Sequence, residues 1–334
     1  MWTATKGVYG FGAIITFGVM AMISCQGSID TQAAVSRIFS RQNSLLKVEK
    51  DTSDREDFVK VVEDRDGHLT RRWREPVHIA VDSLHPIRKD SLAKLVKLER
   101  RRIRDSVRIA LDQLPKHIYL TFDDGPLLGS QAIDSLVQVK NVKANVFLVG
   151  KHRDMSKRLN SYFERYQANP LIACFNHSYT HAENRFTSFY SNPISAFEDF
   201  EKNEQRLGLQ HKIVRLPGRN IWIYDDVRRI DLQSGASTAD MLADNGYKAF
   251  GWDIEWKING ATGKPVESLQ QLYHKIQHFM DNKTSMEPNN VVLLMHDEMF
   301  RTTKGQELLS RLIDTIQTST DYRPEFMTDY PFRY

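Results

Sequence analysis

From residue 117 onward, short apolar runs alternate with longer polar stretches, and this alternation most constrains the fold. Each run has the length of a buried strand, and the stretches between runs are long enough for helices. The runs are IYLTF at 118–122, NVFLVG at 145–150, LIACF at 171–175, KIVRL at 212–216, KAFGW at 248–252 and VVLLM at 291–295. Strands separated by helices predict an α/β fold of βα units, with parallel strands in a sheet or a barrel.

Ionisable and aromatic side chains follow these runs, at the points where the strands should end. In a barrel of βα units, the loops after the strands gather at one end, where chemistry is expected. The residues at these positions are Asp123, Asp124, His177, His181, Arg215, Trp252, Asp253, Glu255, His296 and Asp297. The pattern predicts that residues far apart in the sequence form one site.

Two histidines and a pair of carboxylates suggest a metal centre. His177 and His181 are four residues apart, so on a helical turn both imidazoles would lie on one face. Alone, this spacing is also consistent with two surface histidines. Two histidines and one carboxylate, however, form a common catalytic zinc site. A cation bound to Asp123 or Asp124 would offset the repulsion between them and free the other to act as a base.

A hydrolytic site of this kind also needs an acid for the leaving group. His296, at the end of the last apolar run, is the candidate, with Asp253, Glu255 or Asp297 as its carboxylate partner. A hydrogen-bonded histidine with no catalytic role is an equally good interpretation of His296 taken singly.

Together these motifs resemble those of the polysaccharide deacetylase family, also called the NodB homology domain or carbohydrate esterase family 4. The matching segments are TFDDGP, HSYTH, RLPG, WDIEW and LLMHD, in that order, with ANVFLVG at 144–150 as a second-strand segment. The resemblance covers about residues 117–334. It implies a deformed (β/α) barrel of about seven parallel strands that removes acetyl groups from N- or O-acetylated glycans with one divalent metal.

The resemblance also assigns roles to residues. Asp123 would be the catalytic base, oriented by Arg215, and His296 the acid. Asp124, His177 and His181 would hold the metal, which we expect to be zinc, with cobalt, nickel or manganese as alternatives. Leu294 would line the acetyl pocket.

Two segments depart from the family pattern. An aromatic residue and then glycine usually follow the proline, whereas here Pro217 is followed directly by Gly218, so Gly218 would supply the oxyanion N–H and Trp222 could replace the missing ring. WDIEW matches its motif only loosely, and its register stays open. Either Trp252 or Trp256 corresponds to the family tryptophan near the sugar, and the acid-tuning carboxylate differs accordingly.

The N-terminal segment indicates export. An uncharged apolar run from Val8 to Ile23 is followed by MISC, which resembles the lipobox of bacterial lipoproteins. Residues 1–25 are therefore expected to be a lipoprotein signal with Cys25 as the lipidated residue, or else a membrane anchor. A buried helix is a third interpretation. On the first two, the protein is exported and anchored in the bacterial cell envelope.

Residues 26–116 are charged and poor in glycine, and we expect a stalk with an N-terminal elaboration. Two short strands are predicted around Asp66 and Gly67, followed by an amphipathic helix that Pro115 ends. Its RRRIR segment is a solvated helix face or, less simply, a patch for an anionic polymer. A formal charge of +4 is too small to indicate a nucleic-acid partner.

The resulting hypothesis is a metal-dependent deacetylase, residues 117–334, acting on peptidoglycan, a chitin-like polymer or poly-N-acetylglucosamine. The alternatives are an O-acetyl esterase on xylan-type glycans and a glycan-binding lipoprotein without activity. A binder would be expected to lack a metal ligand, the base or the acid, and all of these are present.

Overall fold

The computed structural model describes residues 59–63, 69–73, 86–257, 259, 262, 264–319 and 321–331. Residues 1–25, with the expected signal and Cys25, lie outside this range. The chain divides into two compact units, Met1–Val107 and Arg108–Tyr334. Within the described part, no helix is both long and apolar enough to span a membrane.

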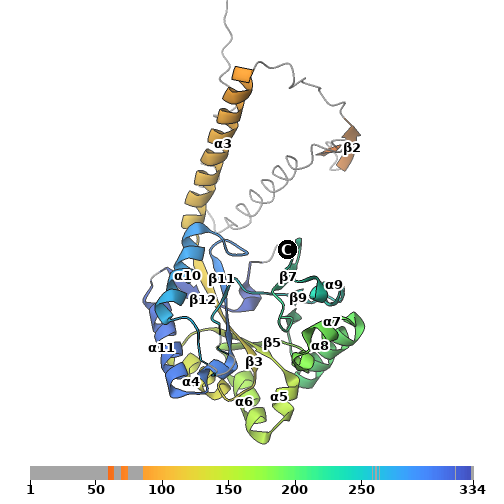
Figure 1. Cartoon of the computed structure of the whole chain (residues 1–334), viewed down its shortest axis with the longest axis vertical. Coiled ribbons are helices and arrows are strands. Elements are labelled where there is room, and N and C mark those ends of the chain that lie inside the picture. The colour runs from red at the N-terminus through yellow and green to blue at the C-terminus, as the bar shows by residue number, and fades with distance from the viewer. Residues whose placement is uncertain are drawn as a thin grey trace, which may run out of the picture. The chain divides into compact units, whose positions relative to one another are not determined.

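The first unit contains the two predicted short strands and most of the predicted helix. Strands β1 (Val59–Glu63) and β2 (Leu69–Trp73) pair antiparallel, which confirms the two predicted strands, whereas the predicted turn at Asp66 and Gly67 lies outside the described residues. Helix α3 (Pro86–Asp112) ends before Pro115, as expected, because proline is poorly tolerated inside a helix. The second unit begins within the last turns of α3 (Figure 1).

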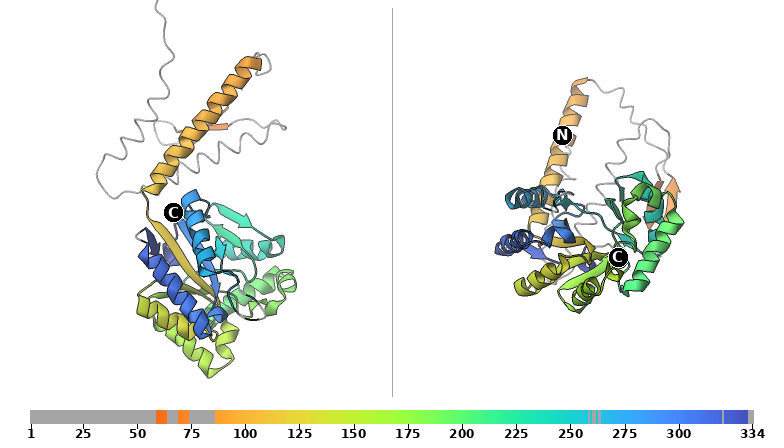
Figure 2. Two further views of the ribbon diagram at one scale, coloured as in Figure 1. Left: turned by 60° about the vertical axis from the view of Figure 1, so that its left-hand side comes forward. Right: turned by 60° about the horizontal axis from the view of Figure 1, so that its bottom comes forward.

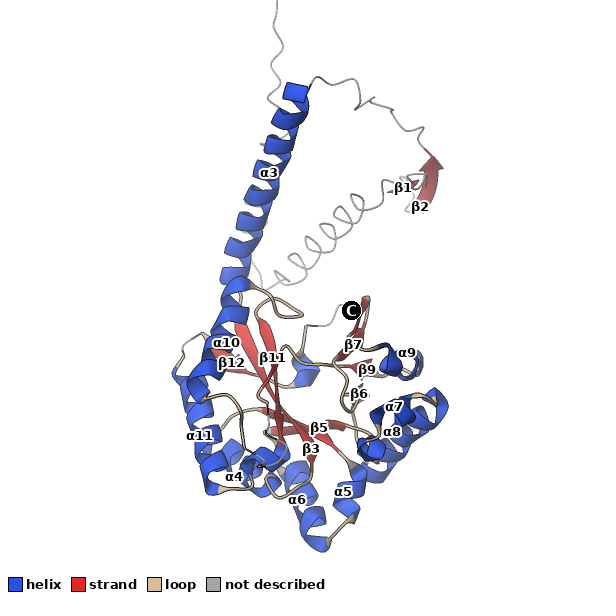
Figure 3. Ribbon diagram, in the orientation of Figure 1, coloured by secondary structure: helices blue, strands red, loops and turns tan. Residues whose placement is uncertain are grey.

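The second unit is built around one mixed sheet, shown in red in Figure 3. Its order is β10-β11-β3-β4-β5-β6-β9-β7-β8, and β12 pairs with the start of β3. The strands are β3 (Lys116–Gly125), β4 (Ala144–Leu148), β5 (Ile172–Asn176), β6 (Ile213–Val214), β7 (Ile221–Tyr224), β8 (Val227–Ile230), β9 (Lys248–Ala249), β10 (Ile254–Glu255), β11 (Asn290–His296) and β12 (Tyr322–Pro324).

The series from β10 to β9 contains seven strands and is parallel throughout, and β12 is also parallel to β3, which agrees with the expected barrel of about seven parallel strands. The hairpin of β7 and β8 continues it in the antiparallel sense. Among the described residues no pairing joins β10 to β8, so the barrel is open, which is consistent with the deformed barrel expected.

Helices lie around the outside of this sheet (Figures 1 and 2). They are α4 (Ser130–Lys140), α5 (Gly150–Asp154), α6 (Lys157–Ala168), α7 (Phe186–Tyr190), α8 (Pro193–Leu207), α9 (Ala236–Asp244), α10 (Leu269–Asn282) and α11 (Thr303–Thr318). Local sequence sets several of their ends. Ser268 and Gln271 form a capping box at the start of α10, and Gly208 ends α8 in the left-handed conformation.

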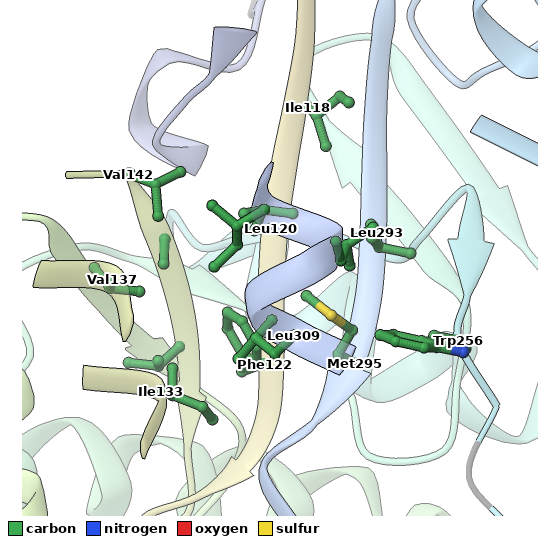
Figure 4. Packing of buried hydrophobic residues seen from close by; sticks show 14 of the residues in the cluster. Ile118, Leu120, Phe122, Ile133, Val137, Val142, Trp256, Leu293, Met295 and Leu309 are labelled. Carbon is green, nitrogen blue, oxygen red and sulfur yellow. The ribbon is translucent and has the colours of Figure 1, made fainter. Parts of the chain in front are cut away.

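The two faces of the sheet bury different side chains because successive strand residues point to opposite sides. Leu120 and Phe122 of β3 face outward and pack with Leu309 of α11 and with neighbouring strands (Figure 4). Tyr119 points inward, into an aromatic cluster with Phe147, Phe175, Trp222 and Phe250. The inner face of β3 then continues through Thr121 to Asp123. The alternation of the core therefore delivers a carboxylate to the interior end of the strand.

Candidate active site

The adjacent aspartates at the end of β3 both reach the interior because the strand is irregular there. In the pairing with β4, Asp123 is opposite Phe147 and Gly125 is opposite Leu148, so Asp124 is an extra residue. Its φ angle is 73°, in the left-handed region. A bulge of this kind re-aims a side chain. Nε2 of His177 consequently lies 3.6 Å from Asp123 Oδ2 and 3.5 Å from Asp124 Oδ1.

Asp124, His177 and His181 converge on one point, as the sequence predicted. One ligand atom from each lies within 4.8 Å of those of the other two. Nε2 of His181 is 3.1 Å from Asp124 Oδ1, which is buried and has no hydrogen-bond partner in the described part of the chain. Burial acts to raise the pKa of Asp124, but the neighbouring His177 and His181 outweigh it and hold the pKa well below its usual value.

A hydrogen bond orients the imidazole of His177, and a short turn positions that of His181. Nδ1 of His177 lies 2.8 Å from the carbonyl of Arg215, which only accepts, so Nδ1 donates this bond and Nε2 of the neutral ring is the nitrogen that could bind a metal. His181 reaches the site from a short turn, His181–Asn184, whose residues have positive φ angles, rather than from the regular helix that the spacing suggested. The donor set and its geometry fit a divalent cation.

The loop that carries both histidines is fixed to helix α8. Asp199 accepts hydrogen bonds from the backbone N–H groups of Tyr179 and Thr180, at 2.9 and 3.0 Å. Asn203 donates to Leu148 O and to Asn176 Oδ1, and it accepts from Gly150 N. The ends of β4 and β5 are thereby tied to one helix.

Arg215 holds Asp123 in place. Its guanidinium is fully buried and donates to Asp123 Oδ1, Thr121 Oγ1, Phe250 O and Gly251 O at 2.8–3.1 Å. It also lies over the ring of Phe147, 4.1 Å from the centroid. Because Oδ1 is occupied by Arg215, Oδ2 is the oxygen that faces Nε2 of His177.

His296 lies beside Asp123 on the neighbouring strand. The two residues are direct partners in the parallel pairing of β11 with β3, so their side chains share a face. Nδ1 of His296 is buried without a hydrogen-bond partner among the described residues. Leu294, two residues earlier, lies on the same face, and Glu255 of β10 is its partner in the register.

Two of the three predicted carboxylate partners of His296 are occupied elsewhere. Asp253 accepts hydrogen bonds from the backbone N–H groups of Met286 and Val292, at 2.7 and 2.8 Å. Asp297 accepts from Gly129 N, Ser130 Oγ and Tyr166 OH, and so holds the loop after β3. Burial raises the pKa of each to about 7. Both act as structural anchors, and the register leaves Glu255 as the carboxylate on the face of His296.

The predicted tryptophans are mostly core residues. Trp256 points to the outer face, is fully buried and donates to Glu267 O, so its assignment to the pocket is wrong. Trp222 is buried in the inner aromatic cluster and cannot replace the missing ring. Trp252 is partly exposed, and Asn220 fixes its backbone: Asn220 Oδ1 accepts from the backbone N–H of Trp252, and Asn220 Nδ2 donates to the carbonyl of Trp252.

Phe186, which sequence reasoning missed, occupies the space beside Gly218. A Cβ atom on Gly218 would lie 3.2 Å from the Phe186 ring, and the φ angle of Gly218 is 65°. The same ring meets His181 edge to face, with centroids 5.7 Å apart. Pro217 is fixed alongside, because its carbonyl accepts from Tyr190 OH at 2.8 Å. No short-range sequence signal links Phe186 to a glycine 32 residues later.

Comparisons with known proteins agree with the fold and the motifs. The sequence model of the polysaccharide deacetylase family matches residues 111–237. A putative polysaccharide deacetylase of Bacillus subtilis, YheN, is 28% identical over 189 residues, which are 54% of this chain and 58% of the relative. The match therefore spans less than two thirds of the curated relative.

Solved structures with a similar fold are more distant in sequence. The catalytic domain of a peptidoglycan N-acetylglucosamine deacetylase from Eubacterium rectale is 22% identical, with a TM-score of 0.48, over 66% of this chain and 94% of that one. An esterase of carbohydrate esterase family 4 from Streptococcus mutans is 17% identical, with a TM-score of 0.48, over 66% and 90%. The domain at residues 111–237 is thus similar in sequence to the polysaccharide deacetylase family.

Proposed function

We propose that this protein is a metal-dependent hydrolase that removes acetyl groups from a polysaccharide containing N-acetylglucosamine. The observation that carries the proposal is that two adjacent carboxylates, those of Asp123 and Asp124, have different partners. Asp124 faces His177 and His181, whereas Asp123 is held by Arg215 through one oxygen and directs the other toward His177. One carboxylate is arranged as a ligand and its neighbour as a base.

Asp124, His177 and His181 would hold the divalent cation. Bound there, the cation would polarise the acetyl carbonyl and acidify a water molecule. Three protein ligands leave positions open for water and substrate, as in catalytic rather than structural zinc sites. Zinc is our first choice, and cobalt, nickel and manganese suit the same donor set.

Asp123 would take the proton from the attacking water. Its Oδ2 lies on the side of the metal ligands, 3.6 Å from Nε2 of His177, while Oδ1 is bonded to Arg215 at 2.8 Å. Arg215 therefore selects the oxygen that acts and prevents rotation of the carboxylate. The side chain of Asp123 is only 4% exposed, so bulk water does not compete for it.

His296 would return a proton to the leaving nitrogen. It shares a face with Asp123 on the next strand. Gly218 would supply the backbone N–H that stabilises the oxyanion, and Leu294 an apolar wall for the acetyl methyl group. A base and an acid on one face of the sheet suit amide hydrolysis, which needs both a proton acceptor and a proton donor.

We further propose that the protein is exported and anchored in the cell envelope through Cys25. The apolar run and the MISC motif support this proposal, which concerns residues outside the described part. Metabolic labelling with palmitate tests it. Incorporation into the full chain, and its loss in Cys25→Ser, is expected, whereas equal labelling of both would contradict lipidation at that residue.

The substrate is tested by acetate release from a panel of glycans. The purified chain would be incubated with peptidoglycan, chitin oligomers, poly-N-acetylglucosamine and acetylated xylan, with and without chelator. Release from an N-acetylglucosamine polymer that stops with chelator is the expected result. Release from xylan alone would indicate an O-acetyl esterase, and no release from any glycan would favour a binding protein.

A further inference from the structure

The main chain of Asp124 is held in an unusual conformation outside the sheet ladder. The β3–β4 register passes from Asp123 to Gly125 and skips Asp124. The flanking Gly125 carbonyl accepts from Val149 N at 2.7 Å, so the ladder resumes at once. At Asp124 itself the φ angle of 73° lies in the left-handed region, which is disfavoured for a residue with a Cβ atom. Some other contact must stabilise this backbone.

His152 supplies that contact. Its Nδ1 lies 2.6 Å from the carbonyl oxygen of Asp124. A carbonyl only accepts, so Nδ1 carries the proton and donates. The bond joins the bulge to the first turn of α5, which directly follows the neighbouring strand β4.

The turn that carries His152 is itself tied to the histidine loop. Lys151 N donates to Tyr179 O at 2.9 Å, and Gly150 N donates to Asn203 Oδ1 at 2.7 Å. Tyr179 lies between His177 and His181 in the sequence. His152 thus links the backbone of one ligand to the segment that carries the other two.

We propose that His152 is a positioning residue for the cation site: its bond to the Asp124 carbonyl fixes the direction of the Asp124 carboxylate and so sets the affinity for the divalent cation. An aspartate side chain has only two torsions, so its carboxylate follows the main chain closely. The inference rests on the proposed function in one respect, namely that Asp124 is a ligand. No substrate contact is assigned to His152.

The test is zinc affinity of the metal-free full chain, measured by competition with a chromogenic chelator. His152→Leu removes the donor, and His152→Asn keeps an N–H close to the position of Nδ1 in a side chain of the same size as leucine. Partners outside the ligand shell typically change metal affinity 10–100-fold, and we expect a loss of about that size for His152→Leu. His152→Asn should retain most of the affinity. His274→Leu, which removes an exposed histidine on α10, should match the parent.

The outcomes separate this inference from the proposed function. If the parent and Asp124→Ala bind zinc equally, Asp124 is not a ligand and the proposed function fails. If Asp124→Ala loses zinc but His152→Leu binds as tightly as the parent, only the role of His152 is overturned. Circular dichroism melts identify a misfolded leucine variant. His152→Ala then takes its place, and equal affinity of the alanine and asparagine variants would also overturn the inference.

Discussion

Replacing Arg215 by methionine should destabilise the second unit strongly, because it leaves buried groups without partners. Asp123 would lose its counter-charge at a site where its side chain is 4% exposed, and the carbonyls of Phe250 and Gly251 would lose donors. Removing one partner of a buried ion pair typically costs about 3–5 kcal/mol. We expect Arg215→Met to lower the free energy of unfolding by about this amount at neutral pH.

The chain offers a matched control in an exposed pair. Arg228 bonds Asp240 with two parallel contacts of 2.9 Å, but the side chains are 53% and 45% exposed. Exposed pairs contribute about 0–1 kcal/mol, so Arg228→Met should change stability little. The contrast between the two variants isolates burial, because the residue exchanged is the same.

Urea denaturation followed by tryptophan fluorescence measures both, since Trp222 and Trp256 are buried in the second unit. A double-mutant cycle with Asp123→Asn then separates the ion pair from the other bonds of Arg215. A favourable coupling energy between positions 123 and 215 is expected. Equal urea midpoints for Arg215→Met and Arg228→Met, or no coupling, would refute the view that Arg215 is the anchor of Asp123.

Three further predictions concern Gly218, Asp297 and the cation site. Gly218→Ala should destabilise the protein by about 1–3 kcal/mol, because the φ angle of 65° disfavours a Cβ atom and that atom would lie 3.2 Å from the Phe186 ring. Thermal melts check this prediction, and an unchanged melting temperature would contradict it. Asp297→Asn should flatten the pH dependence of stability between about pH 4 and 7, because burial raises the pKa of Asp297 from 3.8 to about 7 on folding. The stability that the protonated carboxyl contributes is therefore full below about pH 4 and is lost as the pH rises to about 7. Urea midpoints across that range test this prediction, and the same slope of stability against pH in parent and variant would disprove it. Removal of the divalent cation with chelator should lower the melting temperature of the parent but not of His181→Ala, because a ligand that binds the native state stabilises that state. Equal changes in the melting temperature of both proteins would argue against the proposed cation site.

Local sequence patterns predicted the part of the site that lies at strand ends. The apolar runs locate β3, β5 and β11, and the residues after them include Asp123, His177 and His296. The parallel order brings these ends together without further information. His152 obeys the same rule, since it follows β4 closely, and extending the rule past the first residues of each loop would have found it.

Features set by distant contacts were not predictable in this way. Trp256 and Glu255 are adjacent, and only the register with β11 decides which one faces the interior. Asp297 has the sequence position expected of a catalytic residue, but its carboxylate accepts hydrogen bonds from Gly129, Ser130 and Tyr166, which come from remote parts of the chain. The left-handed conformation of Asp124 likewise depends on partners that the TFDDGP motif does not contain.

The central claim is that Asp123 is the base beside a cation that it does not bind. Its most direct test is acetate release from an N-acetylglucosamine polymer by the parent and by Asp123→Asn, each with its metal content measured. If this claim holds, we expect equal metal content in the two proteins and a large loss of acetate release in Asp123→Asn. An Asp123→Asn protein that is folded, holds the same metal and releases acetate as fast as the parent would contradict it.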